Sequence, residues 1–539
     1  MPGGASLLDI SRSLPEPLPF EPIYARVNNK NEPLCYNVFQ PKKIEFLPAT
    51  TPSGERAYIR SLCMVLYRAV SRVIPEAKLN IRHSVSRGYY CRLGNNVTCT
   101  PELVGRIADE MRNIVSRDIP FERREALTED VLPIFERQGL HDKVELLRTS
   151  HRIYTTYYCL DGICDSYYGT LATSTGMLKV WDLRPFEQGF LLVGFDRNNP
   201  DVTPPHLEQK KLFNAFTEYI EFNKIVGVQT VGGLNSVVSR RRSADLINVA
   251  EALHEKALAH ISDEITRRYH QGGARVVLIA GPSSSGKTTT TKRLGIQLLT
   301  NRLKPQLISL DNYFVDRDKT PRDENGDYDY ESLYALDLQQ FNADLNAILR
   351  GEEVELPYYN FETGRSQKRG EKIKLEEGSI LLIEGIHGLN PALTSDIEER
   401  MKFRVYVSAL TTITLDDHNW IPTTDNRLLR RIIRDHKYRG TSAVETIRRW
   451  PSVRRGEEKW IFPYQENADA MFNSALLFEL AVMKDIAEPI LSKVPHDAVE
   501  YSEAYRLLKF LSYFNPIDLR QIPSTSVLRE FLGGSSFKY

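Results

Sequence analysis

The residues best suited to chemistry form a loop rich in glycine and hydroxyl groups that follows a short apolar run. It reads Gly281-Pro282-Ser283-Ser284-Ser285-Gly286-Lys287-Thr288 and matches the phosphate-binding pattern G-x-x-x-x-G-K-[ST]. The glycines let backbone N–H groups turn toward phosphate oxygens, and the dipole of the following helix adds to that field. Lys287 would neutralise the β- and γ-phosphates, and the Thr288 hydroxyl would ligate Mg²⁺. The loop therefore predicts a site for ATP and Mg²⁺, with contacts from Gly281, Ser283, Ser284, Ser285, Gly286, Lys287, Thr288 and Thr289.

Two acids end the apolar runs that follow this loop. Asp311 comes after Gln306 to Leu310, and Glu384 ends the run that begins at Ser379. Ligands of open α/β sheets gather at the carboxyl ends of strands, so both acids are expected at one edge. Asp311 could accept the proton of an acceptor hydroxyl or hold a water on Mg²⁺, and Glu384 would lie near the metal. The alternatives are a helix or turn cap for Asp311 and a merely solvated strand end for Glu384.

A basic helix is predicted over residues 425–437. Its arginines are spaced by three and four residues on one face, which disfavours the isolated helix unless an anion is present. One interpretation is a mobile lid that closes over transferring phosphates. The other is a solvated face paired with acids such as Asp425 and Asp435. The arginines are Arg427, Arg430, Arg431 and Arg434, with Arg439 just beyond.

The elements that must position these residues alternate between strand and helix from Arg275 onward. Strands are predicted over 275–280, 306–310, 379–384 and 403–407, with helices over 288–300 and 338–350 between them. This alternation is typical of an α/β fold with a parallel sheet covered by helices on both faces. The expected fold class is thus a P-loop NTPase-type parallel-sheet domain, preceded by a separate α+β module.

The chain of 539 residues is too long for one domain of about 150 residues. Before Arg275 the hydrophobic pattern alternates between helix-like and strand-like segments. It predicts a helix from Ser61 to Ile74 and a buried strand from Leu191 to Phe195. A long amphipathic helix is predicted from Ser243 to Tyr269, and the last thirty-odd residues are expected to form a short helix and a loose tail. The predicted divisions are 1–43, 44–235, a linking helix at 236–273, 274–500 and 501–539.

Composition excludes several classes of protein. The chain has 70 Lys plus Arg residues and 70 Asp plus Glu residues, and 41% of its residues are hydrophobic. The hydrophobic content excludes a disordered, highly charged chain, and the balanced charge argues against a positive field over the whole molecule that would attract nucleic acid. Apolar runs are strand-sized and the first twenty residues do not resemble a secretory signal, so we expect no membrane span and a cytoplasmic location. All six cysteines lie in the first third and are expected to be small buried hydrophobes rather than disulfide or zinc ligands.

With these motifs in hand, residues 275 to about 495 resemble the uridine kinase and phosphoribulokinase family of P-loop kinases. The motifs occur in the family's order, from the P-loop through S-x-D-x-[FY]-[FY] and Y-D-Y-E to the arginine-rich helix. The resemblance implies that Asp311 is the general base, Glu384 a magnesium-side acid, and Arg434 and Arg439 lid arginines on the phosphates. It places Tyr359 in the acceptor pocket, with Tyr313 and Arg430 as further substrate contacts, and gives Glu331, or alternatively Asp329, the role of holding sugar hydroxyls.

Three positions depart from the pattern common in uridine kinases. Asn360, Gly364 and Thr441 stand where an Asp, a base-contacting His and a second arginine are usual. The phosphoryl-transfer residues are intact. A different nucleoside or another hydroxyl compound therefore stays open as the acceptor.

The front of the chain resembles the second additional domain of threonyl-tRNA synthetases, preceded by the end of a TGS-like segment. Matches include Ile74-Pro75-Glu76-Ala77-Lys78-Leu79 and Gly88-Tyr89-Tyr90. The four polar editing residues of that family fall on Arg60, Met64, Tyr167 and Leu171. Without a metal-binding or water-activating set, hydrolytic editing is not expected.

The sequence thus predicts an ATP- and Mg²⁺-dependent nucleoside kinase of pyrimidine salvage, acting on uridine or cytidine to give the 5′-monophosphate. A kinase of another small hydroxyl compound, or an ATP-switched RNA- or tRNA-binding protein, is the alternative. The expected partner is a small-molecule acceptor rather than nucleic acid, and a homo-oligomer is expected.

Overall fold

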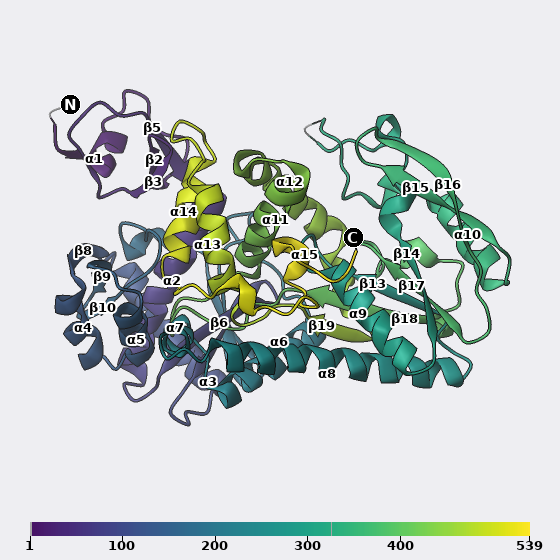
Figure 1. The fold of residues 1–539 in the computed structure, drawn as a ribbon. Coiled ribbons are helices and arrows are strands. Elements are labelled where there is room, and N and C mark those ends of the chain that lie inside the picture. Colours follow the sequence, from purple (N-terminus) through teal and green to yellow (C-terminus); the bar gives the residue numbers. More distant parts are fainter. Residues whose placement is uncertain (1–2, 325, 539) are drawn as a thin grey trace.

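The computed structural model describes residues 3–324 and 326–538. Figure 1 shows the N-terminal half, in purple and blue, beside a C-terminal half in teal and green. The predicted linking helix is confirmed as α8 (Ser243–His270), which runs along the lower edge of the view under the C-terminal half. No helix of the described residues combines the length and the apolar character needed to cross a membrane.

A small β unit begins the chain. Its three-stranded antiparallel sheet has the order β3-β2-β5, and Leu7, Ala25, Val27 and Leu34 fill its core. β5 starts at Ile44 and pairs with β2, so the predicted division at 43/44 cuts through this sheet and the unit extends to Pro48. The elements are β1 (Ala5–Ser6), α1 (Leu7–Arg12), β2 (Pro22–Val27), β3 (Lys30–Pro33), β4 (Asn37–Val38) and β5 (Ile44–Pro48).

The rest of the N-terminal half is an α+β module built around α2 (Pro52–Val73). This helix begins earlier than predicted because the Thr51 hydroxyl accepts the Gly54 N–H and Pro52 suits the first turn. Two antiparallel sheets, β11-β12-β7-β6 and β10-β9-β8, pack with it. The remaining elements are β6 (Leu79–Val85), β7 (Gly88–Leu93), α3 (Pro101–Ser116), β8 (Glu122–Leu127), α4 (Thr128–Arg137), α5 (His141–Thr149), β9 (Tyr154–Leu160), β10 (Ile163–Asp165), β11 (Asp182–Phe186) and β12 (Gly189–Val193).

One expectation about the cysteines is wrong. Cys159 and Cys164 form a disulfide between β9 and β10. The two residues lie directly opposite each other in this hairpin, which brings their side chains within bonding reach. Cys63 and Cys91 are buried thiols, as expected, whereas Cys35 is exposed.

The C-terminal half is organised by a five-stranded parallel sheet with the order β14-β17-β13-β18-β19. The four predicted strands are confirmed as β13 (Val276–Ala280), β14 (Lys304–Ser309), β17 (Ser379–Glu384) and β18 (Lys402–Ser408). The fifth, β19 (Ala470–Asn473), was not predicted because four residues are too short for a periodic signal. Since β17 lies between β13 and β14, the three segments that carry the P-loop, Asp311 and Glu384 end side by side.

Helices cover both faces of this sheet, and an exposed hairpin extends from its far end (Figure 1). The hairpin joins β15 (Val354–Asn360) to β16 (Arg365–Ile373). The helices that follow residue 209 are α6 (Lys210–Val226), α7 (Val231–Ser239), α9 (Lys287–Thr300), α10 (Leu338–Leu349), α11 (Thr423–Arg439), α12 (Ala443–Trp460) and α13 (Glu479–Leu491), together with α8. Of these, α7 packs against α5 rather than on the sheet.

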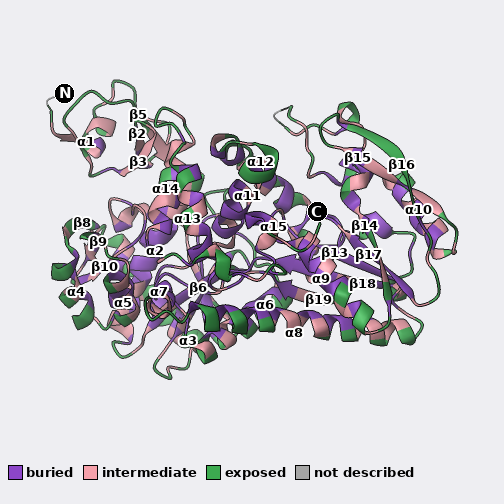
Figure 2. Ribbon diagram, viewed as in Figure 1, coloured by how far each residue is buried: buried purple, intermediate pink, exposed green. Residues whose placement is uncertain are grey.

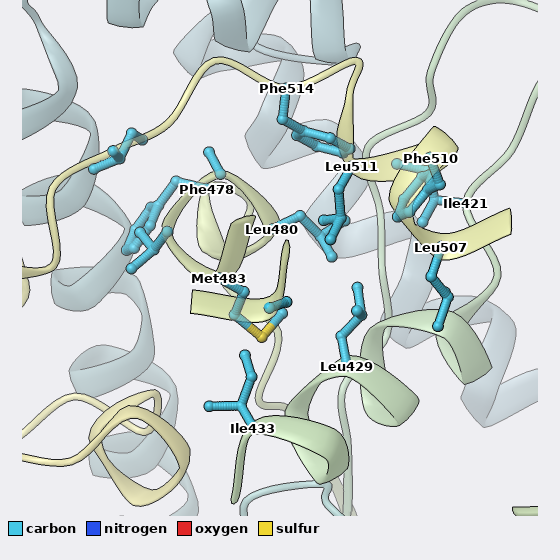
Figure 3. Packing of buried hydrophobic residues seen from close by; sticks show 14 of the residues in the cluster. Ile421, Leu429, Ile433, Phe478, Leu480, Met483, Leu507, Phe510, Leu511 and Phe514 are labelled. Carbon is cyan, nitrogen blue, oxygen red and sulfur yellow. The ribbon is translucent and has the colours of Figure 1, made fainter. Parts of the chain in front are cut away.

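The end of the chain is packed, so the prediction of a loose tail is wrong. α14 (Tyr501–Leu511) and α15 (Arg529–Leu532) place Phe510, Leu528 and Phe531 in the largest hydrophobic cluster, with no exposed surface. Figure 3 shows residues of α11, α13 and α14 meeting in this cluster, and Figure 2 shows buried stretches along these helices. Residues from Leu146 to Leu532 contribute to it, so the two halves share a core.

Candidate active site

The P-loop follows β13 and leads into α9. At two positions in it, Gly281 and Gly286, the structure favours glycine over residues with a side chain. A Cβ on Gly281 would lie 1.9 Å from the Val407 carbonyl oxygen, so no side chain fits there. Gly286 has a φ of +82°, a left-handed conformation that favours glycine. Lys287 follows at the start of α9, and its ammonium group donates to the Pro282 carbonyl oxygen at 3.2 Å. The loop therefore curls back over its own lysine, the arrangement that holds backbone N–H groups around an anion.

Three oxygen-bearing side chains meet beside the loop. The Thr288 and Ser309 hydroxyls lie 3.3 and 3.4 Å from one carboxylate oxygen of Glu384. Burial, together with the nearby charge of Asp311, raises the pKa of Glu384 to about 7. All three groups are hard oxygen donors, and Mg²⁺ is usually held by one or two carboxylates together with hydroxyl groups, phosphates and water. These residues therefore fit a magnesium ion.

Asp311 lies in a short 3₁₀ turn, Leu310–Tyr313, directly after β14. Its side chain keeps exposed surface, so a substrate can reach it. The surrounding protein nevertheless raises its pKa, although Lys287, Arg439 and Arg434 oppose that shift. An accessible carboxylate among three cations is well placed to accept a proton next to phosphate groups.

A second acid, Glu331, lies near enough to Lys287 and Asp311 to interact with their charges. Burial and the charge of Glu457 together raise the pKa of Glu331 to about 7, against the opposing charges of Arg431 and Lys287. Its Oε2 atom is buried and has no hydrogen-bond partner within the described part of the chain. Asp329, the alternative to Glu331, accepts the Glu331 N–H at 3.2 Å. Glu331 therefore keeps a buried oxygen free for a ligand, whereas one oxygen of Asp329 is used on the backbone of its own turn.

Aromatic rings line the approach between the β15–β16 hairpin and the turn after β14. Tyr359 is 2% exposed and packs against Phe314 and Phe361, at ring distances of 5.5 and 5.0 Å. Tyr313 has a different position. Its ring packs on Phe341 and its hydroxyl donates to Asp344 at 3.1 Å, so the position of Tyr313 does not support the predicted substrate contact.

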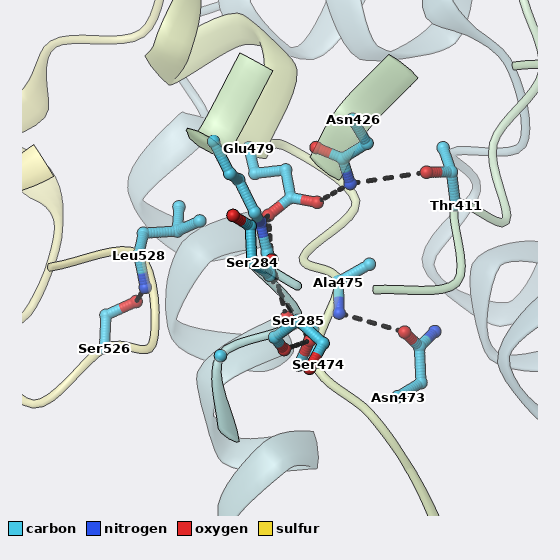
Figure 4. A network of polar contacts seen from close by, with 12 residues as sticks. Ser284, Ser285, Thr411, Asn426, Asn473, Ser474, Ala475, Glu479, Ser526 and Leu528 are labelled. Carbon is cyan, nitrogen blue, oxygen red and sulfur yellow. Dashed lines mark hydrogen bonds and ion pairs between the residues drawn. The ribbon is translucent and has the colours of Figure 1, made fainter. Parts of the chain in front are cut away.

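The arginines of α11 fall into two groups, and the first group is internal. Arg427 and Arg430 are essentially fully buried and form ion pairs with Glu457 and Glu479. Both also donate to P-loop carbonyl oxygens, at 3.1 and 3.4 Å. Figure 4 shows Glu479 between Asn426 and the loop serines. Arg430 therefore supports the P-loop from inside the protein, and its burial argues against the predicted contact with the acceptor.

The second group surrounds one acid. Arg431, Arg434 and Arg439 lie 3.3, 3.0 and 3.3 Å from Asp435. Three guanidinium groups on one carboxylate leave an excess of positive charge beside Asp311. The predicted alternative of pairing with Asp435 is thus found, but it does not neutralise this group.

The chain's own C-terminal segment also reaches the P-loop. Glu530, on α15, accepts the backbone N–H of Thr289 at 3.1 Å and its hydroxyl at 2.7 Å. Glu457, Glu479 and Glu530 were all missed from the sequence because each lies in a helix far along the chain, and only Glu457 belongs to a recognisable acidic run. The dense row of arginines on residues 425–437 indicates that acidic side chains from elsewhere pair with some of them. It does not indicate which acids those are.

Comparison with known proteins covers both halves. Residues 276–478 match the model of the phosphoribulokinase/uridine kinase family. A uridine kinase of Lactobacillus helveticus is 30% identical over 195 residues, which are 36% of this chain and 83% of that protein. A solved structure titled a possible uridine kinase from Bacillus stearothermophilus is 19% identical, with a TM-score of 0.27 over 40% of this chain and 98% of that chain.

The N-terminal region matches a different group. A threonine–tRNA ligase of Desulforamulus reducens is 33% identical over 144 residues, or 27% of this chain, and the match spans about a quarter of that ligase (23%). The ordered motifs, the parallel sheet and the kinase relatives all agree for the C-terminal half. Through that half, the chain belongs to the phosphoribulokinase/uridine kinase family, whose members carry out ATP-dependent phosphoryl transfer.

Proposed function

We propose that the protein transfers the γ-phosphoryl group of ATP to a hydroxyl of a nucleoside, with uridine or cytidine as acceptor and the 5′-monophosphate as product. The observation that carries this proposal is the accessible carboxylate of Asp311 at the edge where the P-loop and Glu384 also end. Asp311 would take the proton of the acceptor hydroxyl as the oxygen attacks phosphorus. Mg²⁺, held by Thr288 and Glu384, would supply charge neutralisation on the phosphates.

The remaining residues divide between donor and acceptor. The P-loop from Gly281 to Thr289 would hold the phosphates, with Lys287, Arg434 and Arg439 compensating the charge that develops during transfer. Glu331, with its unpartnered oxygen, would accept from sugar hydroxyls. Tyr359 is buried, so it would border the base pocket through its packing on Phe361, which is exposed. Arg430 is assigned to the support of the loop. Residues 49–235 are proposed as a separate module without hydrolytic activity.

A panel of nucleosides and sugars tests the assignment. With ATP and Mg²⁺, uridine and cytidine should be phosphorylated with a higher kcat/KM than adenosine, guanosine, ribose or glycerate. Thin-layer separation of products from labelled ATP measures each rate. Faster phosphorylation of a sugar or a sugar acid than of any nucleoside would contradict the proposed acceptor while leaving the kinase assignment intact.

The raised pKa of Glu384 predicts a pH-dependent demand for magnesium. Glu384 must lose its proton to hold the cation, and its pKa is about 7 without metal. Below that value, the apparent Kd for Mg²⁺ should rise roughly tenfold per pH unit, because one proton competes with the metal. Titration of Mg²⁺ at saturating ATP between pH 5.5 and 8.5 checks this. Glu384→Gln should remove the pH dependence, whereas Glu371→Gln, on the exposed β16, should preserve it.

The position of Glu530 predicts that its carboxylate competes with the phosphates of ATP for Thr289. Its carboxylate takes two donors of Thr289 that a nucleotide phosphate would use, and two anions cannot share them. Glu530→Ala should therefore tighten ATP binding by about tenfold, the value of one charge-assisted hydrogen bond. Isothermal titration of ATP measures the change, with Asp518→Asn as a control because Asp518 is bonded only to nearby Arg520 among the described residues. Weaker binding in Glu530→Ala would show that Glu530 supports the loop instead.

A further inference from the structure

A cavity of about 490 Å³ lies where the N-terminal half meets α14, remote in sequence from the P-loop. Figure 1 shows α14, in yellow, set between the small β unit and α2. The walls come from β3, α2, β9 and α14. The volume is in the range of sites for one small organic molecule.

The walls carry far more positive than negative charge. Four of the cations are matched by carboxylates within 3.4 Å: Lys30 by Glu32, Arg56 by Glu503, Arg123 by Glu125, and Arg506 by Asp425. Glu503 pairs with both Arg56 and Arg506, so one carboxylate is shared between two of these positive charges.

Three further cations have no carboxylate within 4.0 Å among the described residues: Arg60, Arg152 and Lys509. Arg60 is only 7% exposed, and its hydrogen bond goes to a neutral group, the Thr170 carbonyl oxygen, at 3.1 Å. Arg152 lies over the ring of Tyr513 at 4.4 Å. Burial, together with the charges of Arg152, Arg123, Arg60 and Lys30, lowers the pKa of Lys509 to about 8.

A folded chain does not gather unpaired, partly buried cations without cost, because each loses hydration and repels its neighbours. A purely structural role would be served by neutral side chains of similar size. An anion with several charges removes the repulsion and restores the lost hydrogen bonds. Three unmatched cations correspond to the charge of a di- or triphosphate group.

The mouth of the cavity offers rings as well as charge. Two tyrosines of the lining are partly exposed: 60% of Tyr154 and 37% of Tyr505 is accessible to solvent. Exposed tyrosine rings stack on nucleic acid bases in a way that tolerates any base. Phosphate-binding cations in the interior and stacking rings at the rim match the two ends of a nucleotide.

We propose that this cavity is a second nucleotide site, which binds a nucleoside di- or triphosphate with its phosphates among Arg60, Arg152 and Lys509. The site shares no side chain with the P-loop, so the proposal does not rest on the proposed kinase reaction. The volume of about 490 Å³ is sufficient for one nucleotide.

Counting sites tests the proposal. Equilibrium dialysis of the full chain against a labelled, non-hydrolysable ATP analogue should give two sites per chain. The double variant Arg152→Gln/Lys509→Gln should give one, while Arg148→Gln, on the exposed face of α5 outside the cavity, should keep two. One site in the unaltered protein, or two in the double variant, would overturn the proposal. Loss of kinase activity with both sites retained would reject the proposed function alone.

A second measurement needs no variant. Because its pKa is lowered to about 8, Lys509 should react with an acylating reagent at pH 8 faster than exposed lysines do. Inorganic tripolyphosphate should protect it at least tenfold, as measured by peptide mass spectrometry. Acylation that tripolyphosphate does not slow would contradict the site, and protection by a short RNA but not by tripolyphosphate or nucleotides would replace it with an RNA site.

Discussion

Replacing Asp311 with Asn should lower kcat by about 10²–10⁴-fold, the usual contribution of a positioned general base. The amide keeps the shape of the carboxylate but cannot take the proton of the acceptor hydroxyl. The affinity for ATP should change little, since the P-loop and Lys287 remain in place. Initial rates with the best acceptor of the panel, together with ATP binding by titration calorimetry, separate the two effects.

Asp318→Asn is the matched control for this variant. Asp318 is an acid seven residues further along, 66% exposed and only distantly paired with Arg365. Its loss changes the net charge equally but should leave kcat within about twofold. A kcat of Asp311→Asn equal to that of the control would remove Asp311 from the chemistry and with it the main support for the proposed mechanism.

The second large effect concerns stability rather than turnover. Glu479→Ala should lower the free energy of unfolding by about 3–5 kcal/mol, because it leaves the charge of Arg430 buried without an opposite charge. Arg430 also holds the carbonyl oxygen of Ser284, so the P-loop should lose order in the same variant. Urea unfolding and hydrogen exchange of the loop amides measure these two consequences.

A double variant without either charge distinguishes the loss of the ion pair from the loss of packing. Arg430→Met combined with Glu479→Leu removes both charges and should recover much of the stability lost in Glu479→Ala. Glu352→Ala breaks a pair with Arg350 whose side chains are more than half exposed, and it should cost about 0–1 kcal/mol. A Glu479→Ala variant as stable as Glu352→Ala would mean that Arg430 finds another anion or becomes hydrated.

The P-loop half illustrates what local sequence can predict. Four of the sheet strands and the P-loop helix were predicted because buried parallel strands are continuous apolar runs and the loop motif fixes the turn between them. Asp311 and Glu384 meet at one edge for the same reason, since β14 and β17 are neighbours. Topology alone brings those two acids together, without any need to know side-chain contacts.

The arginines of α11 show where such prediction ends. Spacing places Arg427, Arg430 and Arg434 on one helix face, but it cannot tell which of them an acid from elsewhere will neutralise. Glu457 and Glu479 arrive from α12 and α13, and only the packed structure separates the two internal arginines from the three around Asp435. The tail was mispredicted for a similar reason. Its glycines and serines suggest disorder, while Leu528 and Phe531 find a core made by other segments.

The packing of the C-terminal segment has a consequence for how the protein is made. As the chain leaves the ribosome, the P-loop and all the kinase motifs emerge long before Val527 and Glu530, which complete the surroundings of Gly286 and Thr289. Domains generally fold as units during synthesis, but this one lacks part of its core until α14 and α15 have been released. A message cut short near codon 500 would therefore yield a chain with every kinase motif and an open apolar surface, a substrate for chaperones and proteases rather than an active enzyme.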